Sequence, residues 1–277
     1  MAMPYRVCII IPPGYTHAAC FLEVAFLLKS SLVSLGRTCD VAFNDFSPLA
    51  TNIVLGYHLL QHGDHLKAFR YIPYQLEQLS AQDGVWSENA QKVLRSATEV
   101  WDYSVENIRF LSENGIAARH VPVGYHPNLE QIRHSASKDI DVLFYGSLGP
   151  RRQKVLDELR AHSDLRTEAV FGVYGKDRDA CIARAKVVIN VHFYSARIFE
   201  AVRISYLLNN RCLVVTEESQ TNPYPDVTLE SVPYERLAER CVELLNDSAR
   251  LSRLSSGAYE QFRRSYPMTE LLRGIVG

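Results

Sequence analysis

Short apolar runs that alternate with helix-like segments place the strongest constraint on how this chain can fold. Residues 187–191 form an almost unbroken apolar run, which is typical of a strand buried on both faces of a sheet. We expect strands at residues 7–11, 39–43, 52–57, 69–72, 99–103, 118–121, 141–145, 168–173, 187–191 and 212–216. We expect helices at residues 19–35, 87–97, 105–114, 151–162, 177–185, 198–208, 234–246 and 248–266. Because strands alternate with helices, the sequence predicts an α/β fold built on parallel sheets.

The alternation is interrupted once, between residues 125 and 138. This stretch contains Pro127 and Asn128 and ends in a polar run, a composition typical of an interdomain linker. The sequence therefore predicts two Rossmann-like domains that face each other across a cleft, at residues 1–126 and 137–277. Such sheets bind ligands beyond the carboxyl ends of their strands, so the functional residues are expected there.

Composition narrows the classes of function. The net charge of -1 and the pI near 6.8 provide no basic field, so we expect no nucleic acid partner. The six cysteines are scattered, which is typical of buried thiols in a reducing cytoplasm rather than of a metal or disulfide framework. No segment approaches 18 consecutive apolar residues, and the first apolar run stops at Pro12. We therefore expect a cytoplasmic protein with no transmembrane segment and no signal peptide.

The first group of candidate residues lies in the stretch DVLFYGSLGPRR, residues 141–152. A strand ends at Tyr145, and Gly146 and Ser147 open a loop of small residues that leads to Arg151. Glycines let the backbone approach a ligand, and a helix N-terminus with arginines favours an anion. The spacing is neither a dinucleotide fingerprint nor a P-loop. The alternative is a tight turn followed by a solvated arginine pair.

The second group follows the strand at 187–191. His192 and Tyr194 come directly after it, and Arg197, Glu200 and Arg203 recur every third residue. On a helix this spacing places the three charged side chains along one stripe. Such a stripe is often a surface ion-pair array of little energetic value, but this one begins where a doubly wound sheet presents its site.

Two further strand ends carry polar candidates. Glu217 follows the strand at 212–216, and Tyr174 follows the strand at 168–173 with a ring that can stack on a base. In the first half, His17 and His58 follow strands and are candidates for a catalytic base, although a histidine at such a position is more often a packed residue. The Asp-x-Asp stretches at 139–141 and 177–179 are not expected to bind a metal, because neither is placed to converge on substrate phosphates.

The stretches DVLFYGSLGPRR, AKVVINVHFY, RIFEAVRISYLLNNRCLVVTEES and VWDYSVENIRFLSENGIAARHVPVGYHP resemble glycosyltransferases of the GT-B type. The resemblance is to group 1-like and spore-maturation-type members and covers roughly residues 100–219. It implies a glycosyltransferase that takes a sugar from a nucleoside-diphosphate donor such as a UDP-sugar. The acceptor would be a hydroxyl of a carbohydrate, glycan or protein. It also implies that no metal and no other cofactor is needed.

The resemblance assigns roles to the candidate residues. Gly146, Ser147 and Arg151 would approach the diphosphate, Glu200 would hold donor hydroxyls, and Tyr174, His192 and Tyr194 would line the donor site. Arg197 and Arg203 would balance the charge of the leaving diphosphate, with His58 or His17 assisting deprotonation of the acceptor. The family's Glu-x7-Glu pattern is broken, since Leu208 stands at its second position and Glu217 is the substitute.

Two other classes of protein remain open. A two-lobed nucleotide- or sugar-binding regulatory protein would keep the cleft without transferring anything. An epimerase or dehydrogenase on a Rossmann fold is disfavoured, because the glycine-rich dinucleotide fingerprint is missing.

Overall fold

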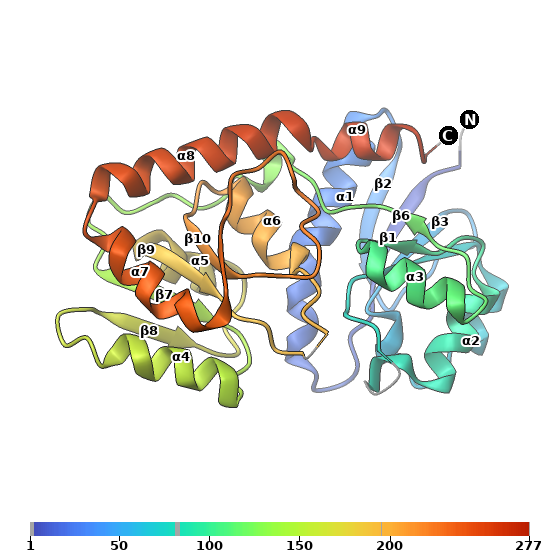
Figure 1. Cartoon of the computed structure of the whole chain (residues 1–277). Helices are drawn as coiled ribbons and strands as arrows, with labels where there is room; N and C mark the ends of the chain where they lie inside the picture. The colour runs from blue at the N-terminus through green and yellow to red at the C-terminus, as the bar shows by residue number, and fades with distance from the viewer. Residues whose placement is uncertain (1–2, 81–83, 195, 277) are drawn as a thin grey trace. The chain divides into compact units, whose positions relative to one another are not determined.

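The computed structural model describes residues 3–80, 84–194 and 196–276, and these divide into two compact units (Figure 1). Unit 1 comprises Met1–His126 and Met268–Gly277, and unit 2 comprises Pro127–Pro267. The sequence placed the end of the second domain at residue 277, so the last ten residues differ from that expectation. They group with unit 1 because helix α9 (Met268–Arg273) packs on helix α1 (Leu22–Ser34) and buries Met268 completely.

Unit 1 is built on a parallel six-stranded sheet of order β2-β1-β3-β4-β5-β6. Its strands are β1 (Tyr5–Ile9), β2 (Cys39–Phe43), β3 (Thr51–Leu55), β4 (Tyr71–Gln75), β5 (Trp101–Asp102) and β6 (Arg119–His120). Besides α1 and α9 it contains α2 (Glu88–Ser96) and α3 (Val105–Glu113), whose N-caps Ser87 and Ser104 accept backbone N–H bonds. A core that includes Val54, Tyr57 and Leu111 fills the space between helices and sheet.

One helical stretch of unit 1, Thr16–Ser34, is 19 residues long with a mean hydropathy of 1.3, values that a membrane span could also have. Leu27, Leu28 and Leu32 are almost fully buried, and α1 packs on β1, β2 and α9. A core helix passes the same test of length and composition, and 44% of the window is buried, whereas Phe26 and Val33 are exposed. Glu23 and Lys29 interrupt the apolar residues of this stretch, so it does not meet the criterion of 18 consecutive apolar residues.

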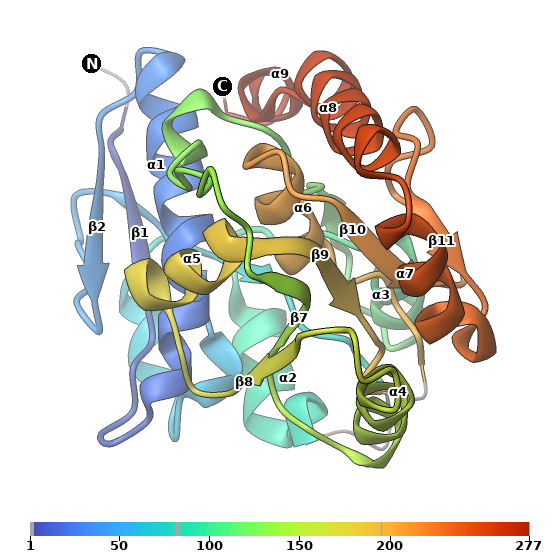
Figure 2. The ribbon, with the colours of Figure 1, turned by 90° about the vertical axis from the view of Figure 1, so that its left-hand side faces the viewer.

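Unit 2 is built on a parallel five-stranded sheet of order β11-β10-β9-β7-β8 (Figure 2). The strands are β7 (Ile140–Tyr145), β8 (Thr167–Val170), β9 (Ala185–Asn190), β10 (Val214–Glu217) and β11 (Glu230–Val232). The helices are α4 (Pro150–Arg160), α5 (Gly175–Arg184), α6 (Ala201–Asn209), α7 (Leu237–Leu245) and α8 (Ser248–Ser265). Val142, Val187 and Val215 from neighbouring strands pack with Leu237 and Leu244 of α7 in one core, which explains their apolar runs.

The strand order explains where a site should form. In unit 2 the chain leaves β7 toward β8 on one side and later returns to β9 on the other. In unit 1 the chain likewise passes from β1 to β2 on one side and to β3 on the other. The loops after the two diverging strands separate at such a switch point and leave room for a ligand at the carboxyl edge.

Candidate active site

The switch point of unit 2 brings together one glycine and a group of charged and polar residues that we call the switch-point cluster. Its members are Gly146, Arg151, Arg152, Asn190, His192, Glu200, Arg203 and Glu217. They come from the loop after β7, the start of α4, the end of β9, the loop and helix after it, and the end of β10. The carboxyl ends of three neighbouring parallel strands therefore contribute to one polar cluster.

Gly146 follows β7 directly, and the Arg203 side chain packs closely against it. Its φ of 129° lies in a region that side chains with a Cβ rarely adopt, and a Cβ there would lie 2.7 Å from Nη2 of Arg203. The Arg203 guanidinium lies 5.1 Å from the Tyr145 ring centroid and donates from Nη1 to Oδ1 of Asn190 at 2.7 Å. Glycine is therefore required at this position, because a larger residue would collide with Arg203.

Glu200 lies at the centre of the cluster, with its side chain 16% exposed. Its Oε2 accepts from Nδ2 of Asn190 at 2.6 Å and lies 3.1 Å from Nδ1 of His192, at an ion-pair distance without hydrogen-bond geometry. Its Oε1 lies 3.5 Å from Nη2 of Arg152. Burial by itself would raise the pKa of Glu200, but His192, Arg203 and Asn190 together lower it. The carboxylate is therefore held in its ionised form.

Arg152 is a member of the cluster that the sequence analysis did not select. It is 4% exposed, donates from Nε to the Val191 carbonyl at 2.8 Å, and donates from Nη1 to the Ser147 carbonyl at 2.8 Å. Burial and the neighbouring Arg203 lower its pKa to about 10, which leaves it charged at neutral pH. Ser147 contributes this carbonyl, and the residue itself is exposed.

Asn190 is the second residue that was missed. It is fully buried at the last position of β9, and its amide bonds Thr216 as well as Glu200 and Arg203. A single polar residue inside the apolar run of residues 187–191 was a signal that could have identified it, since buried amides need partners.

Arg151 and Glu217 form the outer part of the cluster. Nη2 of Arg151 lies 2.6 Å from Oε1 of Glu217, and the Arg151 side chain is 41% exposed whereas that of Glu217 is 1% exposed. Oε2 of Glu217 accepts from the His192 backbone N–H at 3.0 Å. The Arg151 guanidinium also lies 4.3 Å from the Tyr234 ring centroid. Glu217 therefore fixes one arginine at the edge of the site.

His192, Tyr194 and Tyr174, which were predicted to line the donor site, differ in their burial and contacts. His192 is fully buried, and its Nε2 lies 3.2 Å from the Glu218 carbonyl and 3.1 Å from Oγ of Ser219, so its ring is anchored to the segment after β10. Tyr194 is half-buried and packs edge-on against Phe193 at 5.1 Å. Tyr174 is half-buried as the N-cap residue of α5.

The expected stripe of Arg197, Glu200 and Arg203 on one helix face was wrong. Helix α6 begins at Ala201, and Glu200 is its N-cap residue. Arg197 is exposed with a φ of 46°, a left-handed conformation that a helix cannot contain. The chain therefore turns before the helix, which brings Glu200 and Arg203 to the cluster and leaves Arg197 outside it.

The charges of the cluster favour an anion. Arg151, Arg152 and Arg203 carry three positive charges against the two carboxylates of Glu200 and Glu217. Helix α4 begins at this point with Gly149 as N-cap and Pro150 in its first turn, so its first N–H groups add positive potential. Three guanidiniums beside a helix N-terminus can bind phosphate oxygens.

In unit 1, the loops after β1 and β3 carry the two candidate histidines. His17 is half-buried, with its ring 5.5 Å from that of Tyr15. His58 is half-buried between the rings of Phe21 and Tyr57. Burial lowers the pKa of His58 to about 4, so the imidazole is uncharged at neutral pH.

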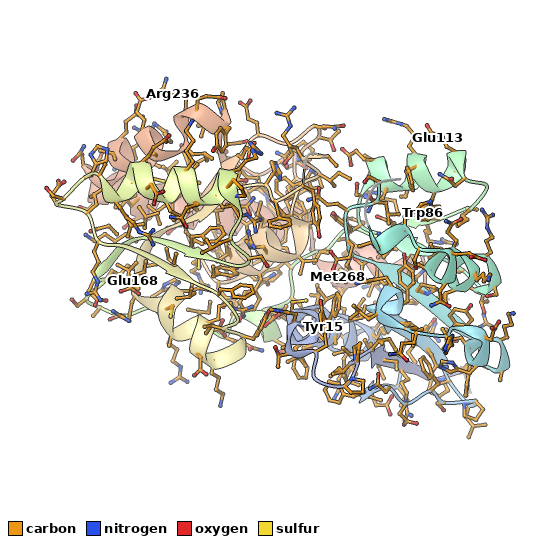
Figure 3. All side chains as sticks on the ribbon, turned by 90° about the horizontal axis from the view of Figure 1, so that it is seen from below. Tyr15, Trp86, Glu113, Glu168, Arg236 and Met268 are labelled. Carbon is orange, nitrogen blue, oxygen red and sulfur yellow. The ribbon has the colours of Figure 1, made fainter. Side chains whose placement is uncertain are left out.

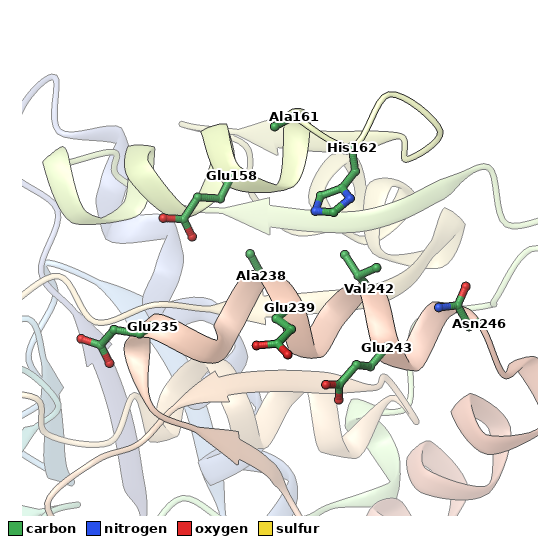
Figure 4. Close-up of a pocket in the computed structure, with 9 residues that line it drawn as sticks. All are labelled: Glu158, Ala161, His162, Glu235, Ala238, Glu239, Val242, Glu243 and Asn246. Carbon is green, nitrogen blue, oxygen red and sulfur yellow. The ribbon is translucent and has the colours of Figure 1, made fainter.

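The acidic residues of the first Asp-x-Asp stretch are paired with basic side chains of unit 2. Asp139 pairs with Arg166 and Arg184, and Asp141 pairs with Lys186. Among the residues that the structure describes, no group of three histidine, cysteine or acidic residues is arranged to hold a metal ion. A groove of about 450 Å³ between α4 and α7 is lined by Glu158, His162, Glu235, Glu239 and Glu243 with a floor of Ala161, Ala238 and Val242 (Figure 4). It lies on helix faces, whereas the cluster lies at the strand ends.

No protein-family model matches the chain. Three proteins of Acanthamoeba polyphaga mimivirus are similar in sequence. Uncharacterized protein L140 is 27% identical over 232 residues, which cover 80% of this chain and 74% of that protein. Uncharacterized protein L137 is 29% identical over 73% of this chain, and uncharacterized protein L138 is 27% identical over 66% of it. The matched region spans only 29% of L137 and 21% of L138.

Several solved glycosyltransferase structures are similar in fold to this chain. T4 phage β-glucosyltransferase in complex with UDP and Mn²⁺ matches with a TM-score of 0.62 over 98% of this chain and 97% of that chain, at 10% identity. A Staphylococcus aureus TarM variant in complex with UDP matches with a TM-score of 0.55 over 80% of this chain and 54% of that chain, at 10% identity. Trehalose 6-phosphate synthase from Burkholderia multivorans matches with a TM-score of 0.52 over 95% of this chain and 75% of that chain, also at 10% identity. The chain thus has the GT-B fold, with two Rossmann-like units that each carry a parallel sheet.

Proposed function

We propose that this chain is a glycosyltransferase that moves a sugar from a nucleoside-diphosphate donor to a hydroxyl of a carbohydrate, glycan or protein. The observation that carries the proposal is the switch-point cluster, in which three arginines and a helix N-terminus surround two fixed carboxylates. The more specific assignment, to the group 1-like or spore-maturation type, rests on the sequence resemblance. Cytoplasmic localisation belongs to the same proposal and is supported by six free cysteines.

The arginines would act on the leaving diphosphate. Each guanidinium has five N–H donors, more than the bond from Arg203 to Asn190 or the pair of Arg151 with Glu217 requires. As the sugar–phosphate bond breaks, negative charge develops on the diphosphate, and fixed positive charges lower the energy of that state. We propose that these groups do this without a metal ion, because the arginines supply the same kind of charge stabilisation.

Glu200 would orient the donor. An ionised carboxylate accepts hydrogen bonds from sugar or ribose hydroxyls, and His192, Asn190 and Arg152 fix its two oxygens. UDP is the first nucleotide to test, since the T4 phage and Staphylococcus aureus structures hold UDP. Unit 1 would supply the acceptor side, with His17 and His58 at its strand ends.

The test is calorimetry of the purified chain against UDP, GDP, dTDP, CMP and NAD, each with and without EDTA. We expect one nucleoside diphosphate to bind and the chelator to leave its affinity unchanged. Arg203→Ala should weaken binding by about 10- to 150-fold, as expected for loss of a charged hydrogen bond worth about 1.5–3 kcal/mol. Exposed Arg253 on α8 provides the control, and Arg253→Ala should bind normally.

Three results would contradict the proposal. Binding of NAD alone would indicate an oxidoreductase, and loss of binding or turnover in EDTA with rescue by Mg²⁺ or Mn²⁺ would remove the metal-free mechanism. Normal nucleotide affinity in Arg203→Ala would place the nucleotide outside the switch-point cluster.

A further inference from the structure

Glu77 lies in the turn that follows β4, at the carboxyl edge of the sheet of unit 1. Its backbone is held on both sides by amide side chains. Nε2 of Gln75 donates to the Glu77 carbonyl at 2.9 Å, and Nδ2 of Asn107 donates to the same carbonyl at 2.8 Å. The Glu77 N–H donates to Oε1 of Gln75 at 3.3 Å, and the Leu79 N–H donates to Oδ1 of Asn107 at 3.0 Å. The turn is therefore fixed by four hydrogen bonds that leave the Glu77 carboxyl group free.

The carboxyl group of Glu77 is half-buried and is not neutralised. Within residues 3–80, 84–194 and 196–276, no side chain forms an ion pair or hydrogen bond with it. Burial raises the pKa of Glu77, as expected when a carboxylate loses water without gaining a partner. A carboxylate that is kept unpaired in a rigid turn at a sheet edge is a common property of functional sites.

Two tyrosines beside the switch point of unit 1 are sensitive to the charge of Glu77. Tyr15 lies in the loop after β1, and Tyr57 lies directly after β3. Burial raises the pKa of each, and the charge of Glu77 raises both further, together with Cys20 for Tyr15 and Asp102 for Tyr57. Glu77 is therefore within electrostatic reach of both loops that diverge there.

Burial changes the pKa values of Glu77 and His58 in opposite directions. His58 has a pKa of about 4, so it holds a proton weakly at neutral pH. A general base works best when its pKa lies near the operating pH, and burial moves Glu77 in that direction.

We propose that Glu77 is the catalytic residue that takes the proton from the acceptor hydroxyl, an inference that rests on the proposed function. The acceptor oxygen forms a bond to the anomeric carbon of the donor sugar. The bond from that carbon to the diphosphate breaks, and the nucleoside diphosphate leaves with the electron pair. The hydroxyl proton moves to a carboxylate oxygen of Glu77, so the step is balanced without a further reactant.

The test compares two small nucleophiles that do not depend on the identity of the acceptor. Water must lose a proton when it attacks the sugar, whereas azide has none to lose. With UDP-glucose, or the sugar of whichever nucleotide binds, we measure nucleoside diphosphate release by wild type and by Glu77→Gln. The variant should lose about 100- to 10,000-fold in kcat with water and should be within a few-fold of wild type with azide. Its nucleotide affinity should be unchanged.

A pH profile gives the second readout. Wild-type kcat/KM with water should fall as pH decreases through the raised pKa of Glu77, because the base becomes protonated, and Glu77→Gln should lack this fall. Glu113→Gln changes an exposed glutamate on α3, labelled in Figure 3, and should behave as wild type in every assay.

The outcomes separate this inference from the proposed function. If wild type releases no nucleoside diphosphate from any donor, both are wrong. If wild type is active and Glu77→Gln hydrolyses the donor at the wild-type rate, only the role of Glu77 is wrong. The role is equally wrong if the variant loses the water and azide reactions to the same extent, since that pattern indicates a positioning or folding defect.

Discussion

Gly146 makes the clearest prediction at the scale of the residue. Gly146→Ala would place a Cβ 2.7 Å from Nη2 of Arg203 and would also strain a φ of 129°. The Arg203 guanidinium must then move away from Asn190, so nucleotide affinity should fall by about tenfold or more while the unit stays folded. Calorimetry with the selected nucleoside diphosphate measures this, and Gly257→Ala, at a position where a Cβ meets nothing within 4 Å, is the control. Equal affinities in the two variants would contradict the steric role of Gly146.

Asp102 makes a second prediction at the same scale. It is fully buried, and its Oδ1 accepts from Ser104 and Asn107 while Oδ2 has no partner among the described residues. Burial raises its pKa well above the ordinary value of about 3.9, against the opposing bonds from Ser104 and Asn107. The folded chain therefore binds this proton more tightly than the unfolded chain does. The resulting stability is fully present below about pH 4 and is lost as pH rises through the raised pKa.

Asp102→Asn tests this because the amide resembles the protonated acid and keeps an acceptor at Oδ1. We expect the free energy of unfolding in urea to fall less between pH 4 and pH 7 in this variant than in wild type. Any fall that remains would come from other groups with raised pKa values, Glu77 among them. An unchanged slope would mean that Asp102 does not carry the buried proton.

At the scale of the element, helix α9 should stabilise unit 1 although it follows unit 2 in the chain. Met268 and Leu272 are fully buried, and α9 packs on α1. Met268→Ala should lower the free energy of unfolding by about 2–5 kcal/mol. Hydrogen exchange can assign the loss, since amides of β1 and β3 should exchange faster while those of β7 and β9 should not. Faster exchange confined to unit 2 would show that α9 belongs with that unit.

The helices and strands also show which elements could be predicted from the sequence and why others were missed or shifted. Strand β2 was predicted at its observed bounds because Cys39–Phe43 is apolar except for Asp40 and is followed by turn residues. Strand β11 was missed because Glu230–Val232 is a short edge strand with little apolar content. Helix α6 was predicted three residues early, since Ile198 and Phe199 continue the apolar pattern and the positive φ of Arg197 has no signal in the sequence.

The candidate site was also predicted only in part, because local backbone angles and helix rotation have no clear signal in the sequence. Gly146, Glu200 and Arg203 were selected because they follow predicted strands, and the structure brings them together at one sheet edge. The sequence could not choose between Arg151 and Arg152, because the rotation of α4 decides which arginine is buried. Predictions from sequence were thus sound for strand ends, where topology decides position, and weak where a single dihedral angle decides it.

At the scale of the whole molecule, we expect a bound nucleotide to affect hydrogen exchange differently in the two units. The switch-point cluster lies within unit 2, and Glu77 lies within unit 1. A bound nucleoside diphosphate should therefore slow hydrogen exchange most strongly at residues 146–153 and 190–217, because anion binding removes local opening there. Arg203→Ala should abolish this protection, whereas Glu77→Gln should leave it intact, since that residue is proposed to act on the acceptor proton alone. Protection that is strongest at the strand ends of unit 1 would reverse the assignment of donor and acceptor sides.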